Sequence, residues 1–300
     1  MKHYIYYPII LSALAACSTK PEYDAQGTFE ATEVTVSAET TGKILYLEIE
    51  QGDRVTAGQQ VGRIDSTQLV LQKIELESQR SALEKSRPNL DDQTASLKEQ
   101  ISGTVTERDR IARLLAEGAA TQQQLDNLNT RLASLKGQLA AQKSSVSNNI
   151  STIDKQIEAL TVKTRAIDDQ ISKCAIISPI SGIVLNKIAE AGEVASFGKH
   201  LFKVADMSNI YLRAYFTSDQ LATIKLGRKV KVMADYGGGN EKEYEGVVTF
   251  ISPQSEFTPK TIQTKDSRAN LVYAVKIAVR NDGLLKIGMT GNVYVGNRSK

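Results

Sequence analysis

Residues 42–65 read GKILYLEIEQGDRVTAGQQVGRID, and residues 182–206 repeat the pattern as GIVLNKIAEAGEVASFGKHLFKVAD. Three glycines of the first copy recur 140 residues later, at unchanged spacing within the copy. The matching pairs are Gly42 with Gly182, Gly52 with Gly192, and Gly58 with Gly198. A stack of repeats needs about three units or more to bury a core. The two copies are therefore expected to complete one small β-domain together, with these glycines at its turns.

Two series of residues at seven-residue spacing, apolar at every position except Thr104, occupy the segment between the copies. The first comprises Leu69, Leu76, Leu83, Leu90, Leu97, Thr104 and Ile111, and the second comprises Leu125, Leu132, Leu139, Val146, Ile153, Leu160, Ile167 and Cys174. This spacing is typical of a coiled-coil seam. Between the series, Gly118 suits the end of one helix, and Thr121 with Gln124 predicts a capping box at the start of the next. Residues 66–174 are therefore predicted to form an antiparallel α-helical coiled-coil hairpin with its tip at residues 115–122.

Pro88 interrupts the first arm of this hairpin. The arms, residues 66–115 and 121–174, would each extend roughly 75–80 Å at about 1.5 Å per residue. A proline inside a helix removes one hydrogen bond and clashes with the preceding turn, so a kink or a break is expected near Pro88. The polar residues 147–149 of the second arm are expected to lie roughly opposite Pro88, which predicts that both arms weaken at a similar height. A tolerated irregularity and a functional hinge both fit this pattern.

The last third of the chain alternates apolar and polar residues in short stretches separated by Gly, Asn, Asp and Pro turns, which predicts β-strands. The stretches are residues 210–216, 229–232, 246–251, 272–277 and 291–295. Residues 27–37, ahead of the first copy, alternate in the same way and are expected to pair with them. Residues 219–226 favour a short helix.

The N-terminus has the pattern of an exported protein. Residues 1–16 are largely apolar after a basic start and too short to span a bilayer as a helix, which predicts a signal peptide. Ala15, Ala16 and Cys17 resemble the bacterial lipobox, whose cysteine is lipidated; an ordinary signal peptide with an incidental cysteine is the alternative. A lipidated Cys17 would anchor the protein to a membrane. Cys174 ends the apolar seam and is expected to be a buried small hydrophobe.

Few residues are suited to catalysis or metal binding. His3 and His200 are the only histidines, too few for a zinc-binding histidine cluster, and His200 is expected to be a turn residue. The chain has no glycine-rich phosphate-binding motif with its lysine, and residues 237–240 read as a hairpin turn. A net charge of +3 with both signs intermingled does not indicate a nucleic-acid partner. We expect no enzymatic activity, no cofactor and no metal.

The split glycine pattern, its lead-in Ser178-Pro179-Ile180-Ser181-Gly182 and the hairpin together resemble HlyD-type periplasmic adaptors, also called membrane fusion proteins, and among them the lipoprotein adaptors of ABC-type efflux systems. The resemblance covers nearly the whole chain. It implies an elongated, mixed α and β fold: a lipoyl-like β-sandwich split by the hairpin and followed by a small β-barrel domain. The implied divisions are 1–16 signal peptide, 17–36 anchor linker and first barrel strand, 37–65 first lipoyl-like half, 66–174 hairpin, 175–206 second half, 207–297 barrel and 298–300 tail.

A lipoyl-like domain also raises the alternative of a carrier whose lysine bears lipoate or biotin. In such carriers the lysine occupies the tight turn between the two halves. Here the hairpin replaces that turn, so no equivalent lysine is expected.

Family adaptors that engage TolC-like ducts carry an Arg at the hairpin tip, then a Leu after three residues, then a Ser after six more. The corresponding residues here are Arg110, Leu114 and Thr121, where Thr keeps the hydroxyl and adds a methyl group. The resemblance implies that these three contact the outer-membrane duct. From helix periodicity alone, Arg110 reads as a solvated residue, Leu114 as a seam residue and Thr121 as a cap.

The resemblance implies a non-catalytic periplasmic adaptor, lipid-anchored at the inner membrane, that forms a homo-oligomer, expected to be a hexamer. It would bridge an inner-membrane transporter to a TolC-like outer-membrane duct. Only residues 292–300 follow Gly291, fewer than the membrane-proximal domain usual in adaptors of RND pumps requires, which favours an ABC-type transporter. The alternative is a structural coiled-coil lipoprotein that tethers envelope layers without transport. The sequence does not indicate the transported substrate.

Overall fold

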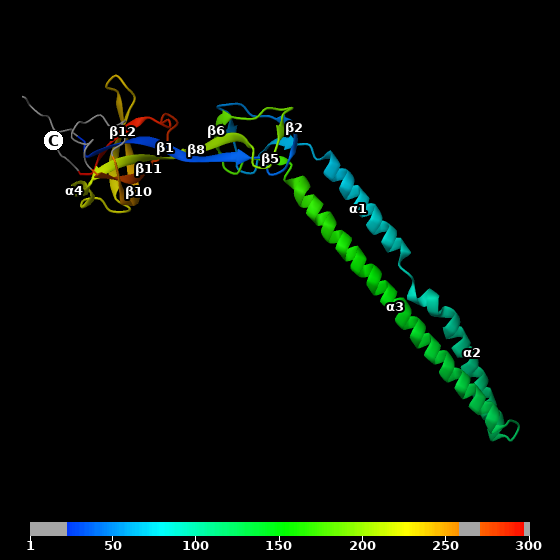
Figure 1. Ribbon diagram of the computed structural model, residues 1–300. Coiled ribbons are helices and arrows are strands. Elements are labelled where there is room, and N and C mark those ends of the chain that lie inside the picture. Colours follow the sequence, from blue (N-terminus) through cyan, green and yellow to red (C-terminus); the bar gives the residue numbers. More distant parts are fainter. Residues whose placement is uncertain (1–22, 258–270, 297–300) are drawn as a thin grey trace, which may run out of the picture.

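The computed structural model describes residues 23–257 and 271–296 as three parts in a row: a β-barrel, a β-sandwich and a helical hairpin that leaves the sandwich at an angle (Figure 1). The strands are β1 (Ala25–Ser37), β2 (Gly42–Leu47), β3 (Arg54–Val55), β4 (Gln60–Ile64), β5 (Ala175–Ile177), β6 (Gly182–Lys187), β7 (Val194–Ala195), β8 (His200–Thr217), β9 (Lys229–Asp235), β10 (Glu241–Phe257), β11 (Leu271–Arg280) and β12 (Thr290–Tyr294). The helices are α1 (Thr67–Ser86), α2 (Leu90–Ala116), α3 (Gln122–Ser172) and α4 (Ser218–Leu221). The predicted signal peptide, Cys17 and the tail 298–300 lie outside the described residues.

The two copies of the glycine pattern interlock in the sandwich, which confirms that they complete one domain. β2 of the first copy pairs with β7 of the second, and β6 of the second pairs with β3 of the first. The hydrogen bonds keep the same offset of 140 residues: the Gly52 N–H donates to the Val184 carbonyl at 2.9 Å, and the Gly192 N–H donates to the Ile44 carbonyl at 2.8 Å. Both copies supply the core, which includes Ile44, Leu47, Val61, Ile64, Val184, Leu201, Phe202 and Val204.

The repeated glycines fall into two groups. Those in turns have a positive φ, which only glycine adopts freely: Gly52, Gly58, Gly192 and Gly198. Gly42 and Gly182 do not lie in turns, contrary to expectation, because they begin β2 and β6. A Cβ on Gly182 would lie 2.1 Å from the Ala205 carbonyl oxygen, and one on Gly42 would lie 2.7 Å from Ile64 Cγ2. These two glycines therefore permit a close approach of neighbouring strands.

Six antiparallel strands close the barrel in the order β1-β12-β9-β10-β11-β8, with β8 paired back to β1. Alternate residues of these strands point into its core, which includes Phe29, Leu212, Phe216, Val232, Ile277 and Val293. The strands predicted from alternation in the last third of the chain fall on β8, β9, β10, β11 and β12. α4 is shorter than the helix predicted over residues 219–226.

β1 and β8 run together from the barrel into the sandwich (Figure 1). They pair from Gln26 with Tyr215 to Ser37 with His200, and one register shift leaves residues 207–209 of β8 without a partner on β1. The domain boundary expected between residues 206 and 207 therefore lies inside a strand, at this bulge. The barrel is therefore joined to the sandwich by a hydrogen-bonded ribbon of two strands. Such a ribbon is stiffer than a single-chain linker.

The first arm of the hairpin is broken and the second is continuous. α1 and α2 are separated at residues 87–89, where Arg87 takes an extended ψ of 118° ahead of Pro88, as a residue before proline prefers. α3 runs unbroken through residues 147–149, so the prediction that both arms weaken there was wrong. Polar side chains do not end a helix whose seam residues pack, and Val146 is buried beside them.

A charged network ties the β9–β10 hairpin to the loop ahead of β12. Tyr244 Oη lies 3.1 and 3.2 Å from the two carboxylate oxygens of Asp282, and Lys242 Nζ lies 2.6 Å from the same carboxylate. The Leu284 N–H also donates to it, at 3.0 Å. The hydrogen bond from Lys242 is the largest cause that lowers the pKa of Asp282, from 3.8 to about 2.

Asp282 should therefore make the stability of the barrel depend on acid pH. A lowered carboxyl pKa stabilises the fold above the ordinary value of 3.8, and this contribution is lost as the pH falls towards about 2. Asp282→Asn should lower the Tm at neutral pH and flatten the fall in Tm over that acid range. Thermal unfolding of both proteins across the range checks this, and equal acid slopes would contradict it.

Candidate functional site at the hairpin tip

α2 ends in a backbone loop that reverses the chain at the hairpin tip. The Ala119 N–H donates to the Leu114 carbonyl at 2.8 Å, and the Gly118 N–H donates to the Leu115 carbonyl at 3.0 Å. This pair of bonds is a Schellman motif, which requires a left-handed residue. Gly118 has a φ of 77°, as predicted.

Thr121 caps the N-terminus of α3. Its Oγ1 accepts the Gln124 N–H at 3.3 Å, and the Gln124 Oε1 accepts the Thr121 N–H at 2.8 Å. This reciprocal arrangement is the capping box predicted from the sequence. Thr121 is also exposed, so a protein that binds the tip can reach it.

Arg110 and Leu114 lie one helical turn apart on α2, so they share a face of the helix. The Arg110 side chain is 62% exposed, and its Nη2 lies 2.6 Å from Glu107 Oε1. The hydrogen bond to Glu107 raises the pKa of Arg110, which therefore stays charged. Exposed ion pairs of this kind contribute little to stability, so Arg110 can exchange Glu107 for an acceptor on another protein. Leu114 is half-buried.

Loss of the cap should fray the tip, because an N-cap threonine typically contributes about 1 kcal/mol. Thr121→Ala should speed amide exchange in the first turn of α3 about fivefold. Thr121→Ser keeps the hydroxyl and should change that rate by less than about twofold. Hydrogen exchange followed by mass spectrometry checks this; the same protection in the Ala and Ser variants would show that the cap contributes nothing.

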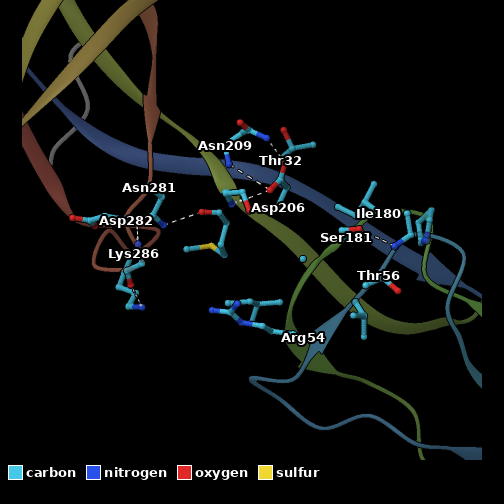
Figure 2. Close-up of a pocket in the computed structure, with 18 residues that line it drawn as sticks. Thr32, Arg54, Thr56, Ile180, Ser181, Asp206, Asn209, Asn281, Asp282 and Lys286 are labelled. Atoms are coloured by element: carbon cyan, nitrogen blue, oxygen red, sulfur yellow. Dashed lines mark hydrogen bonds between the residues drawn. The ribbon is translucent and has the colours of Figure 1, made fainter.

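Apart from the tip, a concave site lies where the barrel meets the sandwich (Figure 2). This cleft of about 920 Å³ is lined by polar residues that include Thr32, Arg54, Ser181, Asp206, Asn209 and Lys286. The Asp206 carboxylate accepts the backbone N–H groups of Ser208 and Asn209 and the Asn209 side-chain amide, so its oxygens are occupied within its own turn. Sequence reasoning missed this cleft because the β8 bulge, the loop after β11 and the sandwich turns meet only in the fold.

The other chemistry-bearing side chains are structural. Cys174 is fully buried, as expected, and burial raises the pKa of its thiol. His200 begins β8, where its Nδ1 lies 2.8 Å from Ser37 Oγ, so it is a strand residue and not the turn residue predicted. Within residues 23–257 and 271–296, no group of three His, Cys, Asp or Glu side chains is placed to hold a metal ion. No helix in the same part of the chain is long and apolar enough to cross a membrane.

Comparisons with known proteins agree with this architecture. The family model for the RND MFP barrel-sandwich hybrid domain matches residues 32–207, more than half of the chain. A UPF0194 membrane protein of Acidithiobacillus ferridurans is 25% identical over 291 residues, which cover 90% of this chain and 85% of the relative. A UPF0194 membrane protein of Yersinia enterocolitica is 26% identical over 294 residues, which cover 88% of this chain and 86% of the relative. The crystal structure of MacA from Actinobacillus actinomycetemcomitans has the same fold, with a TM-score of 0.56 and 22% identity over 90% of this chain and 76% of that one.

Proposed function

The chain belongs to the RND membrane fusion protein family that carries this barrel-sandwich hybrid domain, and from that premise we propose that it is the periplasmic adaptor of an efflux or secretion system. It bridges an inner-membrane transporter to a TolC-like outer-membrane duct and catalyses no reaction. The observation that carries the proposal is the exposed tip, with Arg110, Leu114 and Thr121, at the end of a long helical hairpin (Figure 1).

The mechanism is positional. α3 has 51 residues, a length of about 75 Å at 1.5 Å per residue, so the tip stands far from the barrel. Only residues 173 and 174 separate α3 from β5, and the β1–β8 ribbon continues the connection into the barrel. Because α3 passes the break at Pro88 without interruption, the break does not cut the hairpin. A displacement of the barrel at the inner membrane would therefore be transmitted to the tip.

The membrane attachment and the assembly complete the proposal. Lipidated Cys17 holds the barrel end at the inner membrane, with the rest of the protein in the periplasm. Several copies, in a hexamer, form a ring around the conduit. The ABC-type transporter favoured from the sequence stays a prediction. The name of the matched family refers to RND pumps instead. Copurification of an ATP-binding cassette protein with the tagged chain would support it, and copurification of an RND pump would contradict it.

Deleting the gene separates transport from tethering. An adaptor predicts raised sensitivity to toxic compounds or loss of a secreted product, both restored by the wild-type gene. A structural lipoprotein that spaces the envelope predicts altered distance between the membranes in electron micrographs, with export unchanged. That second outcome would contradict the proposed function.

A further inference from the structure

The cleft between the barrel and the sandwich has the size and the lining of a small-molecule site. Its volume of about 920 Å³ lies in the range of ligand pockets in proteins. One side is formed by β3, β6 and the turns beside them, and the other by the β8 bulge and the loop after β11. Three half-buried apolar residues, Ile180, Ile183 and Met207, are part of the lining. The cleft therefore offers apolar surface to a ligand that lies between the two domains.

Two cationic side chains line this cleft, one from each domain. Arg54 lies on β3, and within the described residues its guanidinium has no hydrogen bond or ion pair. Lys286 follows β11, and in the same part of the chain its Nζ makes one bond, to the Gly283 carbonyl at 3.0 Å. An ammonium group has three donors, so two are left for a ligand. In Figure 2 the Arg54 side chain extends from the sandwich toward the barrel, on whose side Lys286 lies. An anion in the cleft can therefore be bound from both domains.

The two carboxylates that line the cleft do not occupy these cations. The Asp206 carboxylate accepts three N–H groups of its own turn. The Asp282 carboxylate binds a different cation, Lys242, whose Nζ is 2.6 Å away. Because both carboxylates already have partners, Arg54 and Lys286 are available to an anionic group from outside the chain.

The internal repeat supplies a counterpart of this site that has no cleft. Arg54 of β3 is paired with Ile183 of β6. At the same offset of 140 residues, Val194 of β7 is paired with Lys43 of β2. Each pair places one cation beside one aliphatic residue, but only Arg54 and Ile183 line the cleft, while Lys43 and Val194 are exposed. Lys43 is therefore the matched control for Arg54.

We propose that this cleft binds an anionic small molecule with an apolar body. Arg54 and Lys286 bind its anionic group, and the aliphatic side chains of the lining pack against the rest. The ligand is a dissolved molecule and not a lipid of the bilayer. Thr32, which lines the cleft, follows Ala25 by seven residues along β1, roughly 23 Å at about 3.3 Å per residue. The cleft is thus well removed from the barrel end at which the chain leads back to Cys17. This site goes beyond the proposed function, which assigns no ligand to the adaptor.

Two fluorescent probes test the proposal, anilinonaphthalene sulfonate and N-phenylnaphthylamine, because they share an aromatic body and only the first carries a negative charge. The full chain is expressed with Cys17→Ser, so that no lipid is attached and no detergent competes for the probes. Fluorescence titration should show saturable binding of the sulfonate. Arg54→Gln and Lys286→Gln should each raise its Kd about fivefold, and Arg54→Lys, which keeps the charge, should raise it less. Lys43→Gln should leave the Kd unchanged, and none of the variants should alter binding of the uncharged naphthylamine.

Three results would overturn the proposal. The first is no saturable binding of the sulfonate, or the same Kd in the wild type and in the variants at positions 54 and 286. The second is an equal loss of naphthylamine binding in those variants, because the cations would then not recognise charge. The third is flotation of the protein with phosphatidylglycerol vesicles that Arg54→Gln abolishes, because the cation would then bind a lipid headgroup. Unchanged circular dichroism in each variant excludes unfolding as the cause. None of these measurements involves the hairpin tip, so their failure leaves the bridging role untouched.

Discussion

A strain that carries Arg110→Asp should lose export to the level of a deletion strain while it accumulates normal amounts of folded protein. Arg110 is exposed and makes one ion pair, with Glu107, on its own helix, so its replacement should leave the free energy of unfolding almost unchanged. A guanidinium offers a planar fork of donors to a carboxylate or carbonyl group on a partner. Aspartate removes those donors and adds a second carboxylate one turn from Glu107, so it repels any acceptor that Arg110 binds.

Lys163→Asp is the control for this change. Lys163 is another exposed basic residue of the hairpin, but it lies far from the tip. Export should be normal in that strain. Growth in the presence of a toxic compound, or release of the secreted product, measures export, and immunoblots measure protein levels. Normal export with Arg110→Asp at wild-type protein levels would remove Arg110 from the proposed contact.

Gly182→Ala should destabilise the sandwich strongly, although it adds only one methyl group. The added Cβ would lie 2.1 Å from the Ala205 carbonyl oxygen and 3.1 Å from Val204 Cγ2. Because the first contact is with backbone, a side-chain rotation cannot relieve it, and β6 must move away from β8. Overpacking of this kind costs about 1–3 kcal/mol and sometimes more, a large part of the stability of a small domain.

Gly103→Ala is the matched control, because it adds the same methyl group inside α2, where no atom beyond the adjacent backbone of the helix lies within 4 Å of it. Alanine is favoured over glycine in a helix by about 1 kcal/mol, so this variant should be slightly more stable. Urea unfolding followed by circular dichroism measures both changes. A Gly182→Ala protein that unfolds at the wild-type urea concentration would show that β6 and β8 are not packed as closely as described.

The features that the sequence predicted correctly depend on repeated or local chemistry. The offset of 140 residues between Gly52 and Gly192 reappears as paired hydrogen bonds because the two copies share a glycine and apolar pattern and fold alike. The heptad leucines predicted the hairpin because a seam must repeat every seven residues. Gly118 and Thr121 predicted the tip because helix ends have characteristic caps within a few residues.

The features that the sequence did not predict depend on how distant segments meet. In the sequence, Gly42 and Gly182 look the same as the turn glycines. Only the strands packed against them show that these two glycines allow neighbouring strands to come close together. The ribbon of β1 and β8 crosses the expected boundary at residue 206, because pairing continues past a bulge that no local pattern marks. The tip residues Arg110, Leu114 and Thr121 lie at the end of the hairpin, but their contact with a duct depends on a second protein and stays a prediction.

A photoreactive amino acid placed at Glu117 tests the central proposal most directly. Glu117 is the C-cap residue after α2 and is exposed in the tip loop, so the probe leaves Arg110, Leu114 and Thr121 unchanged. Irradiation of living cells, followed by mass spectrometry of the crosslinked product, identifies the protein that the tip touches. We expect a TolC-like outer-membrane duct to be captured from position 117 and not from a probe at Lys163. Capture of no outer-membrane protein from position 117, in cells that still export, would contradict the bridging role.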